Sequence, residues 1–339
     1  MRKMNKILVT GGAGFIGSNF IKILLSELDF EIVNLDALTY AGNLENLKEI
    51  ENNKRYTFIR GEIQDKPLVE KIIEEYGIDS IINFAAESHV DRSILDAKPF
   101  IDTNIQGTLT LLESSVKHKI KRFLQVSTDE VYGSLGKTGL FTEKTPISPN
   151  SPYSASKASA DHLVMAFVNT FDIDALITRC SNNYGPYQFP EKLIPLMILN
   201  TRDEKKLPVY GDGMQIRDWI HVEDHCRGIL TVFENGRSGE AYNIGGNCEK
   251  PNIEIVKLII DSLGKSEDLI DYVKDRPGHD RRYAIDSSKI KEELGWEPRI
   301  KFEDGIKETI DWYLTNSEWC DNLRSGAYLE YYKKQYEDR

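Results

Sequence analysis

The sequence contains few cysteines, and none of them is arranged to bind a metal. Only Cys180, Cys226, Cys248 and Cys320 occur among 339 residues, and they are far apart in the chain. No Cys-x-x-Cys motif is present, and no Cys/His cluster has the spacing of metal ligands. This scarcity excludes a cysteine-built zinc site and a disulfide framework. We therefore expect no metal, and we expect reduced thiols in a cytoplasmic protein.

The sequence also lacks long apolar runs and an excess of positive charge. No stretch approaches the roughly 18 uninterrupted apolar residues that indicate a membrane span. The first apolar run ends at a glycine turn, so we expect no secretory signal. The formal net charge is −11, which argues against binding to nucleic acid, since that requires a basic surface. A small anionic substrate is still compatible with this charge, because a few local arginines can build its site.

Short apolar runs alternate with longer amphipathic runs in the first half of the chain. We predict strands at 7–9, 32–35, 56–59, 80–84, 123–126 and 175–177, and helices at 15–27, 68–76, 100–118 and 153–171. This alternation predicts an α/β fold with a doubly wound parallel sheet. After Gly185, prolines interrupt a shorter pattern, with a strand at 240–244 and helices at 253–263 and 302–314.

A glycine-rich turn follows the first predicted strand and opens the first predicted helix. Gly11, Gly14 and Gly17 are spaced as G-x-x-G-x-x-G, which allows a pyrophosphate to rest on the helix N-terminus. A glycine turn without a ligand is the alternative. Asp36, which ends the second strand, favours the cofactor, because its carboxylate can accept hydrogen bonds from both ribose hydroxyls and repels a 2′-phosphate. The pattern predicts NAD rather than NADP.

We therefore predict that residues 1–185 form a Rossmann-type NAD-binding domain. Residues 186–339 would form a smaller C-terminal α/β lobe that binds the substrate, with some segments returning to the main sheet.

The ends of the third and fourth predicted strands supply more of the same groove. Glu62 and Ile63 could meet the adenine. The small side chains of Ala85 and Ala86 would let the cofactor pass close to the backbone, with ordinary packing as the alternative. For Asp65 we expect a helix N-cap instead.

Two neighbouring acids follow the fifth predicted strand, in the triplet Thr128-Asp129-Glu130. Open α/β sheets bind their ligands at such strand ends. Tyr153 and Lys157 come next, one helical turn apart, so both side chains share a face. The spacing alone is uninformative, because this composition produces such a pair by chance, but its position after the fifth strand favours a role. A cationic lysine would lower the pKa of the phenol and let Tyr153 act as a base.

The alternative for the two acids is structural, with Asp129 as a turn or helix cap and Glu130 as a solvated side chain.

Together these motifs resemble the extended short-chain dehydrogenase/reductase family and, within it, the dTDP-glucose 4,6-dehydratases. The closer resemblance lies in residues 34–43, 85–93, 181–188 and 275–283, and the resemblance as a whole covers nearly the entire chain. Sugar-nucleotide epimerases of the same superfamily lack the adjacent Asp-Glu pair, and GDP-mannose dehydratases lack the Thr-Asp-Glu triplet. One departure is Glu62, where the family more often has aspartate.

The resemblance implies a lyase that converts dTDP-glucose to dTDP-4-keto-6-deoxyglucose, a step of deoxysugar (for example rhamnose) biosynthesis, with tightly held NAD. Tyr153 would remove the O4 proton while NAD takes the C4 hydride, with Thr128 near O4 and Lys157 on the nicotinamide ribose. Glu130 would then remove the C5 proton, Asp129 would protonate the departing C6 hydroxyl, and the hydride would return to C6.

The resemblance also implies two sets of binding residues. For the cofactor these are Gly11, Gly14, Phe15, Ile16, Gly17, Asp36, Leu38, Thr39, Glu62, Ile63, Phe84, Ala85, Ala86, Ser88, Thr103, Tyr153, Lys157 and Asn183. For the nucleoside-diphosphate sugar they are Ser88, Glu87, Thr128, Asn182, Lys192, Leu193, Pro208, Tyr210, Arg217, Asn252, Arg276, His279 and Tyr283. Arg217 and Arg276 are the first choices for the diphosphate, because a guanidinium fork can bind two oxygens. We expect His89, His118 and His162 to be structural or surface residues.

Other functions stay open at this point. Another NAD-dependent nucleotide-sugar enzyme is one, such as a UDP-glucose 4,6-dehydratase or a 4-epimerase. A non-catalytic NAD-binding regulator is another, although it would be expected to lose Tyr153, Lys157 or Glu130. We also expect a homodimer, in which the helices at 100–118 and 153–171 of both subunits form a four-helix bundle.

Overall fold

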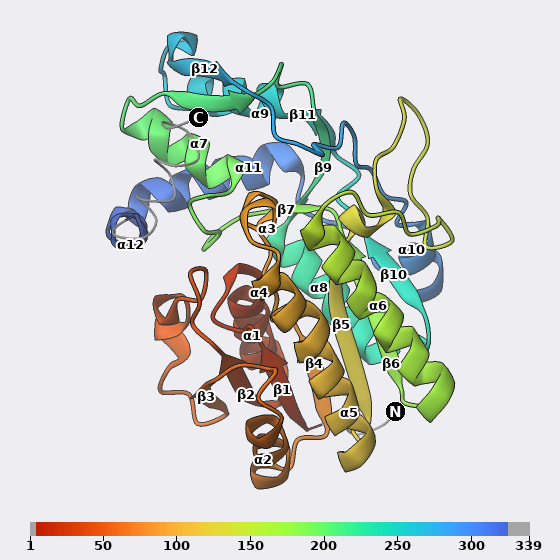
Figure 1. Ribbon diagram of the computed structural model, residues 1–339. Helices are drawn as coiled ribbons and strands as arrows, with labels where there is room; N and C mark the ends of the chain where they lie inside the picture. The colour runs from red at the N-terminus through yellow and green to blue at the C-terminus, as the bar shows by residue number, and fades with distance from the viewer. Residues whose placement is uncertain (1–4, 325–339) are drawn as a thin grey trace.

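A parallel sheet of seven strands forms the centre of the computed structural model, which describes residues 5–324 (Figure 1). Its strands are β1 (Lys6–Thr10), β2 (Glu31–Asp36), β3 (Tyr56–Arg60), β4 (Ser80–Asn83), β5 (Arg122–Thr128), β6 (Ala175–Cys180) and β10 (Ala241–Ile244). They lie in the order β10-β6-β5-β4-β1-β2-β3. The order reverses at β1, and open α/β sheets bind their ligands at such a switch point. The predicted fold class is confirmed.

Helices cover both faces of this sheet, which explains why its strands read as continuous apolar runs. On one face lie α1 (Phe15–Glu27), α8 (Val222–Asn235) and α10 (Ser288–Leu294), which share one apolar core. On the other lie α2 (Lys66–Tyr76), α5 (Thr108–His118) and α6 (Pro152–Phe171), which share a second core (Figure 1). The sheet is therefore buried on both sides, and its carboxyl edge is left for function.

Local sequence signals explain where two of these helices begin and end. The Asp65 side chain accepts a hydrogen bond from the Leu68 N–H at 3.1 Å, which confirms the predicted N-cap of α2. Helix α2 ends at Gly77, whose φ is +63°. At the start of α6, Ser151 and Ser154 form a reciprocal capping box.

The helix predicted at 100–118 is not one regular helix. It consists of α4 (Lys98–Phe100), a π-helical segment η2 (Ile101–Gly107) and α5. The wider turns of η2 place buried Asn104 where its Nδ2 donates to Ser156 Oγ at 2.8 Å and to the Glu87 carbonyl at 3.0 Å. Hydrophobic periodicity does not reveal such a distortion, and the polar contacts that accompany it join Asn104 to residues far away in the chain.

The second half of the chain builds a smaller lobe above the carboxyl edge of the sheet (Figure 1). Its strands are β7 (Asn182–Tyr184), β9 (Ile216–His221) and β11 (Glu249–Pro251) in one sheet, and β8 (Leu207–Tyr210) and β12 (Ile270–Val273) in another. Its helices are α7 (Leu193–Arg202), α9 (Asn252–Ser262), α11 (Phe302–Thr315) and α12 (Ser317–Leu323). From the same half, β10 pairs in parallel with β6, and α8 packs on the main sheet.

Short elements complete the path of the chain. These are η1 (Leu44–Ile50), α3 (Val90–Leu95), η3 (Asp129–Tyr132) and η4 (Glu267–Leu269). Within residues 5–324, no helix combines the length and the apolar character that crossing a membrane demands.

Candidate active site

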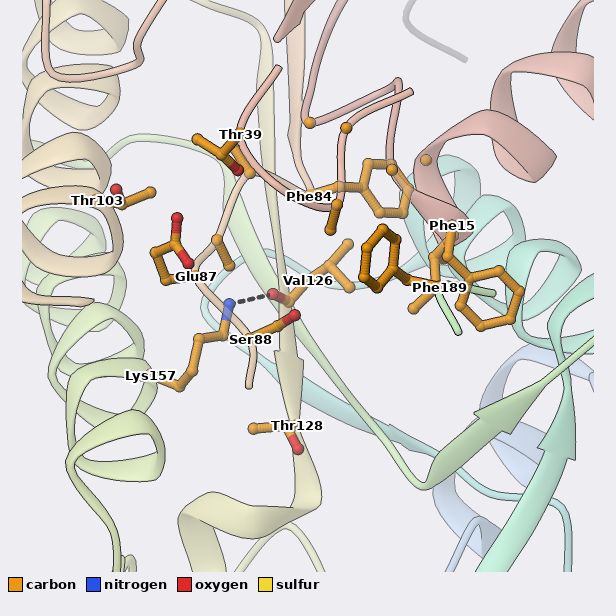
Figure 2. Close-up of a pocket in the computed structure, with 18 of the residues that line it drawn as sticks. Phe15, Thr39, Phe84, Glu87, Ser88, Thr103, Val126, Thr128, Lys157 and Phe189 are labelled. Atoms are coloured by element: carbon orange, nitrogen blue, oxygen red, sulfur yellow. Dashed lines mark hydrogen bonds between the residues drawn. The ribbon is translucent and has the colours of Figure 1, made fainter. Parts of the chain in front are cut away.

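A cavity of about 320 Å³ opens at the carboxyl edge of the main sheet (Figure 2). The glycine turn and the segments that follow β2, β3, β4 and β5 line it. Every residue predicted to bind the cofactor lies in this lining except Leu38, whose backbone N–H instead donates to Asp36 Oδ1 at 2.8 Å. The tertiary structure thus brings together residues from eight separate parts of the sequence.

The glycine turn brings backbone against backbone, which leaves no room for side chains. Gly11 has a φ of +68°, and a Cβ there would lie 2.6 Å from the backbone nitrogen of Ala85. A Cβ on Gly17 would lie 2.4 Å from the Gly11 carbonyl oxygen. The N-terminus of α1 therefore faces the cavity without an intervening side chain, as a bound pyrophosphate requires.

The Asp36 carboxylate at the end of β2 is 7% exposed and already accepts two backbone hydrogen bonds. Its Oδ2 accepts from the Ala13 N–H at 2.8 Å, and its Oδ1 accepts from Leu38. Burial raises the pKa of Asp36, and the two N–H groups oppose that rise. Each oxygen has a second lone pair for a ribose hydroxyl. Among the described residues that line this cavity there is no arginine that could pair with a 2′-phosphate.

Tyr153 and Lys157 lie on the wall formed by α6, and both are buried, at 8% and 3% exposure. Lys157 Nζ donates to the carbonyl of Val126 in β5 at 2.7 Å (Figure 2). Burial lowers the pKa of Lys157, and the Asp161 carboxylate opposes that effect.

The prediction that Lys157 lowers the phenol pKa is wrong for this structure. Burial, followed by the negative charge of Glu130, holds the pKa of Tyr153 well above its usual value. The lysine is committed to a carbonyl, and the cost of burying a phenolate dominates.

The two acids begin the short η3 turn, directly after β5. The hydroxyl of Thr128 caps this turn by accepting from the Glu130 N–H at 3.3 Å. The cap of this turn is therefore Thr128, and the alternative in which Asp129 serves as a cap is wrong. Asp129 is 2% exposed, and its Oδ2 has no hydrogen-bond partner among the described residues.

The surroundings of the two acids separate their protonation. Burial, then the charges of Glu130 and Asp218, raises the pKa of Asp129 well above its usual value. Burial also raises the pKa of Glu130, but Arg276, Arg217 and Lys192 oppose that rise. The nearby anions add to the effect of burial at Asp129, whereas the nearby cations oppose it at Glu130, so Asp129 is the acid that holds its proton more readily. Two carboxyl groups with pKa values pushed apart can serve as an acid and a base.

A second cavity of about 160 Å³ adjoins the first. The predicted substrate residues that line it are Ser88, Asn182, Lys192, Leu193, Pro208, Tyr210, Arg217, Asn252, Arg276, His279 and Tyr283. Glu87 and Thr128 line only the first cavity. The residues shared by both cavities are Ser88, Glu130, Asn182, Glu191 and Lys192. A ligand that spans the two cavities would thus place its middle beside Glu130.

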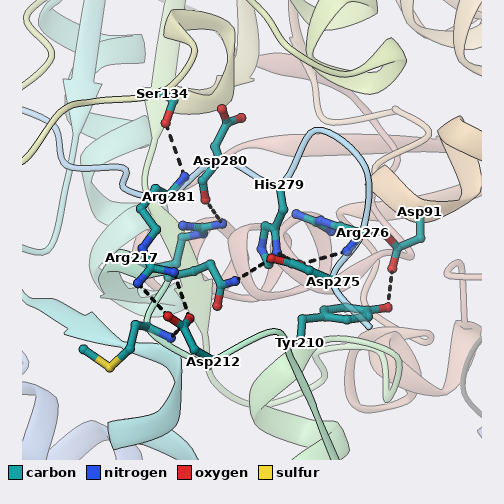
Figure 3. Close-up of polar contacts among 12 residues, drawn as sticks. Asp91, Ser134, Tyr210, Asp212, Arg217, Asp275, Arg276, His279, Asp280 and Arg281 are labelled. Atoms are coloured by element: carbon teal, nitrogen blue, oxygen red, sulfur yellow. Dashed lines mark hydrogen bonds and ion pairs between the residues drawn. The ribbon is translucent and has the colours of Figure 1, made fainter. Parts of the chain in front are cut away.

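Two arginines supply positive charge to the second cavity (Figure 3). The Arg217 guanidinium lies 4.4 Å from the ring centre of Tyr283, and its Nη2 donates to the Asp280 carbonyl at 3.0 Å. Arg276 Nη1 donates to Asp91 Oδ1 at 3.3 Å. Its Nε is buried without a partner among residues 5–324. A buried cationic N–H without an acceptor fits a site for an anionic group.

The sequence comparisons agree with this geometry. The model of the family described as GDP-mannose 4,6 dehydratase matches residues 8–309. The chain belongs to the GDP-mannose 4,6-dehydratase family. A dTDP-glucose 4,6-dehydratase of Xanthomonas campestris pv. campestris is 56% identical, over 95% of this chain and 96% of its own. The resemblance stated from the sequence is therefore confirmed.

Solved structures of related enzymes have the same fold. One is a dTDP-glucose 4,6-dehydratase from Bacillus anthracis in complex with NAD, with a TM-score of 0.89 and 55% identity over 94% of this chain and 99% of that chain. Another is a UDP-glucose 4-epimerase from Thermotoga maritima with UDP-glucose, with a TM-score of 0.86 but only 30% identity, over 92% of this chain and 99% of that chain.

Two buried acids of this site were not identified from the sequence. Asp91 is 3% exposed, and besides Arg276 it accepts from the hydroxyl of Tyr210 at 3.0 Å (Figure 3). Glu191 is 5% exposed and pairs with Arg92 at 3.0 Å. Asp91 lies inside residues 85–93, a segment already singled out by the resemblance, so its role could have been suspected. Glu191 follows Pro190, and nothing in the sequence nearby indicated burial.

Two of the three histidines lie away from both cavities. His162 is exposed and His118 is partly exposed, and neither lines a cavity. His89, expected to be structural or on the surface, lines the second cavity and lies 3.9 Å from Glu191. In the described part of the chain, no three or more His, Cys, Asp or Glu side chains are grouped so that they could hold a metal ion.

Proposed function

We propose that this chain is an NAD-dependent lyase that removes water from dTDP-glucose and gives dTDP-4-keto-6-deoxyglucose. The observation that carries the proposal is the meeting point of the two cavities. There the Tyr153–Lys157 pair faces one cavity, and Asp129 and Glu130 stand between it and the arginines of the other. A 4-epimerase needs Tyr153 and Lys157, but it eliminates no water and therefore does not need Asp129 and Glu130 as an additional acid and base.

The cofactor fits the first cavity. The glycine turn would hold the pyrophosphate, and Asp36 would accept hydrogen bonds from the adenosine ribose. When bound, NAD supplies a hydride acceptor for C4 and a hydride donor for C6. Thr128 would hydrogen-bond the sugar O4, and Tyr153 would take the O4 proton as a phenolate. The positive charges of Lys157 and of the bound oxidised cofactor would stabilise that phenolate against the effect of burial. Lys157 stays next to Tyr153 and would hydrogen-bond the second ribose.

The elimination falls to the acid pair. Once C4 is a ketone, the C5 proton is acidic. Glu130, which the arginines help to ionise, removes it. Asp129, kept protonated by burial and by its neighbour Glu130, donates a proton to the C6 hydroxyl, which departs as water. When the hydride then adds to C6, C5 takes up a proton, which completes the 4-keto-6-deoxy product. A positioned acid or base of this kind typically contributes about 10²–10⁴-fold in rate.

The second cavity would hold the nucleoside diphosphate. Arg217, Arg276 and Lys192 would neutralise the two phosphates, since arginine binds phosphate oxygens in a fork. Strand β8, with Pro208 and Tyr210, would pack against the base. The regulator hypothesis is disfavoured because Tyr153, Lys157 and Glu130 are all present.

Mass spectrometry tests the proposal directly. Purified protein is incubated separately with dTDP-glucose and with UDP-glucose. We expect dTDP-glucose to lose the mass of one water. An epimerase would leave the mass of the substrate unchanged. Loss of water from UDP-glucose alone would mean that the substrate is the UDP-sugar and not dTDP-glucose. If neither substrate changes, the proposed activity is wrong.

Three further expectations accompany this proposal. The reaction would serve deoxysugar synthesis in the cytoplasm, for example that of rhamnose. Residues 1–185 would form the NAD-binding domain and residues 186–339 the substrate-binding lobe. A homodimer through α5 and α6 is supported by their side-by-side course in Figure 1 and by exposed Ala155, Ala166 and Phe171 on α6. Light scattering that gives the mass of a monomer would exclude this dimer.

A further inference from the structure

A buried chain of three side chains connects the helix of Tyr153 and Lys157 with the turn of Asp129 and Glu130. At its centre is Arg179 on β6, which is 5% exposed. Its Nε donates to Asp161 Oδ2 at 2.8 Å, and its Nη1 donates to the hydroxyl of Tyr132 at 2.9 Å. Asp161 and Tyr132 are 1% and 3% exposed. None of the three lines either cavity.

Each end of this chain lies next to catalytic groups. Asp161 stands on α6, one helical turn after Lys157. Tyr132 is the last residue of η3, which begins with Asp129. Arg179 itself lies opposite Ser127 in the register of β5 and β6. From β6, the Arg179 guanidinium therefore connects the helix that carries Tyr153 and Lys157 with the turn that carries Asp129 and Glu130.

The turn depends on this connection more than the helix does. Helix α6 has separate anchors near the site, because Lys157 donates to Val126 and the hydroxyl of Ser156 accepts from Asn104 at 2.8 Å. The η3 turn is a single short turn. Its lateral side-chain contact is the Tyr132 hydroxyl, which accepts from Arg179 and donates to Asn243 Oδ1 at 2.8 Å. A backbone contact accompanies it, because the Val131 carbonyl accepts from the Ser148 N–H at 3.0 Å. Loss of that hydroxyl should therefore shift the turn and leave the helix in place.

We propose that Arg179 is a positioning residue that, through Tyr132, holds Asp129 and Glu130 at the separation from Tyr153 that the elimination step needs. This inference rests on the proposed function. Arginine suits the task because its planar fork aims two N–H groups in fixed directions, whereas a lysine would offer one point charge. A buried ion pair contributes little net stability, so a role in geometry is the better explanation of its presence.

The test separates the two halves of the reaction in single turnovers with dTDP-glucose. Absorbance of the reduced nicotinamide follows oxidation at C4, and incorporation of solvent deuterium at C5 follows proton removal. In Tyr132→Phe we expect oxidation within about threefold of wild type and C5 exchange slower by roughly 10–100-fold, the range that a displacement of about 1 Å produces. Reduced cofactor should therefore accumulate. Arg179→Lys should slow the same step. The double variant of Tyr132→Phe and Arg179→Lys should slow C5 exchange little further, because both residues act through one connection.

Tyr242→Phe is the matched control. Tyr242 is fully buried on β10 beside Asn243, but its hydroxyl donates to Glu293 Oε2 at 3.0 Å, away from the cavities. Both halves should keep their wild-type rates in this variant.

Equal slowing of both halves in Tyr132→Phe, or no slowing of either, overturns the positioning role. If Arg179→Lys does not fold, as judged by its NAD content, Tyr132→Phe alone decides. A wild-type protein that never removes water from dTDP-glucose would instead overturn the proposed function, and the two failures are thereby distinguished.

Discussion

Replacing Gly11 by alanine should weaken NAD binding and destabilise the fold for two reasons that can be measured separately. The first is backbone strain, because the φ of +68° at Gly11 lies in the left-handed region. The second is a collision, because the added Cβ would lie 2.6 and 2.7 Å from the backbone N and Cα of Ala85. Those atoms are backbone atoms at the end of β4, so they cannot turn aside as a side chain would.

Two other glycines isolate each contribution. Gly77 has a φ of +63°, and no atom of residues 5–324 lies within 4 Å of the position of its Cβ, so Gly77→Ala introduces strain alone. Gly17 has no positive φ, but its Cβ would lie 2.4 Å from the Gly11 carbonyl oxygen, so Gly17→Ala introduces collision alone.

The expected magnitudes follow from these geometries. Left-handed strain costs about 1–2 kcal/mol, and the reduced entropy of the unfolded chain returns about 0.4–1 kcal/mol, so Gly77→Ala should lose about 1 kcal/mol. Overpacking costs roughly 1–3 kcal/mol, so Gly11→Ala should lose about 2–4 kcal/mol. That loss is below the typical total of about 5–15 kcal/mol, and the variant should still fold.

Urea unfolding of NAD-free protein measures the stability, and titration with NAD measures the affinity. We expect Gly77→Ala to bind NAD normally, because Gly77 ends α2 far from the cavity lining. Gly11→Ala displaces Ala85 in that lining, and we expect its affinity to fall about 10–100-fold, which corresponds to about 1.4–2.8 kcal/mol. A Gly11→Ala protein that unfolds like Gly77→Ala and binds NAD like wild type would refute this reasoning.

Four further predictions concern the acid Glu130, the tyrosine Tyr153, the cation Arg276 and the buried histidine His225. Glu130→Gln should keep its NAD and form reduced cofactor, but it should slow C5 deuterium exchange by about 10²–10⁴-fold. Near-normal dehydration by this variant would contradict the role of Glu130 as the base. Tyr153→Phe should instead form no reduced cofactor. Arg276→Lys keeps the charge but loses the fork, so KM for dTDP-glucose should rise about tenfold, the equivalent of about 1.4 kcal/mol, with kcat little changed. Burial lowers the pKa of His225 to about 3 from 6.5. As the pH falls below 6.5, the unfolded chain takes up a proton at this histidine before the folded chain does. The stability present above pH 6.5 should therefore decline as the pH falls toward 3. His225→Gln should flatten that decline in urea titrations, and an unchanged slope would exclude His225 as its source.

The parts of the site that could be predicted are those that a local motif specifies. The glycine turn, Asp36 and the end of β5 were found because strand, turn and acid follow one another in sequence. Asp65 as an N-cap was found for the same reason. The helix at 100–118 was predicted as regular, because local periodicity does not mark its π-helical segment, and the contact of Asn104 with Ser156 in that segment joins residues 52 positions apart.

The pKa of Tyr153 shows where such reasoning ends. The spacing of Tyr153 and Lys157 on one helical face suggested that the lysine would lower the pKa of the phenol. The structure turns the ammonium to the Val126 carbonyl and buries the phenol beside Glu130, so the pKa rises. Burial and neighbouring charge depend on elements far apart in the chain.

The sequence by itself determined the class of fold, and it indicated that the glycine turn, the two acids and the Tyr–Lys pair belong to the site, because periodicity and motifs are local properties of the chain. Only the tertiary structure decided that Glu130 stands where two cavities meet, that Asp91 holds both Arg276 and Tyr210, and that Arg179 connects α6 to the η3 turn. The physical reason is that hydrogen bonds, desolvation and charge act over a few ångströms in space, whatever the separation in sequence.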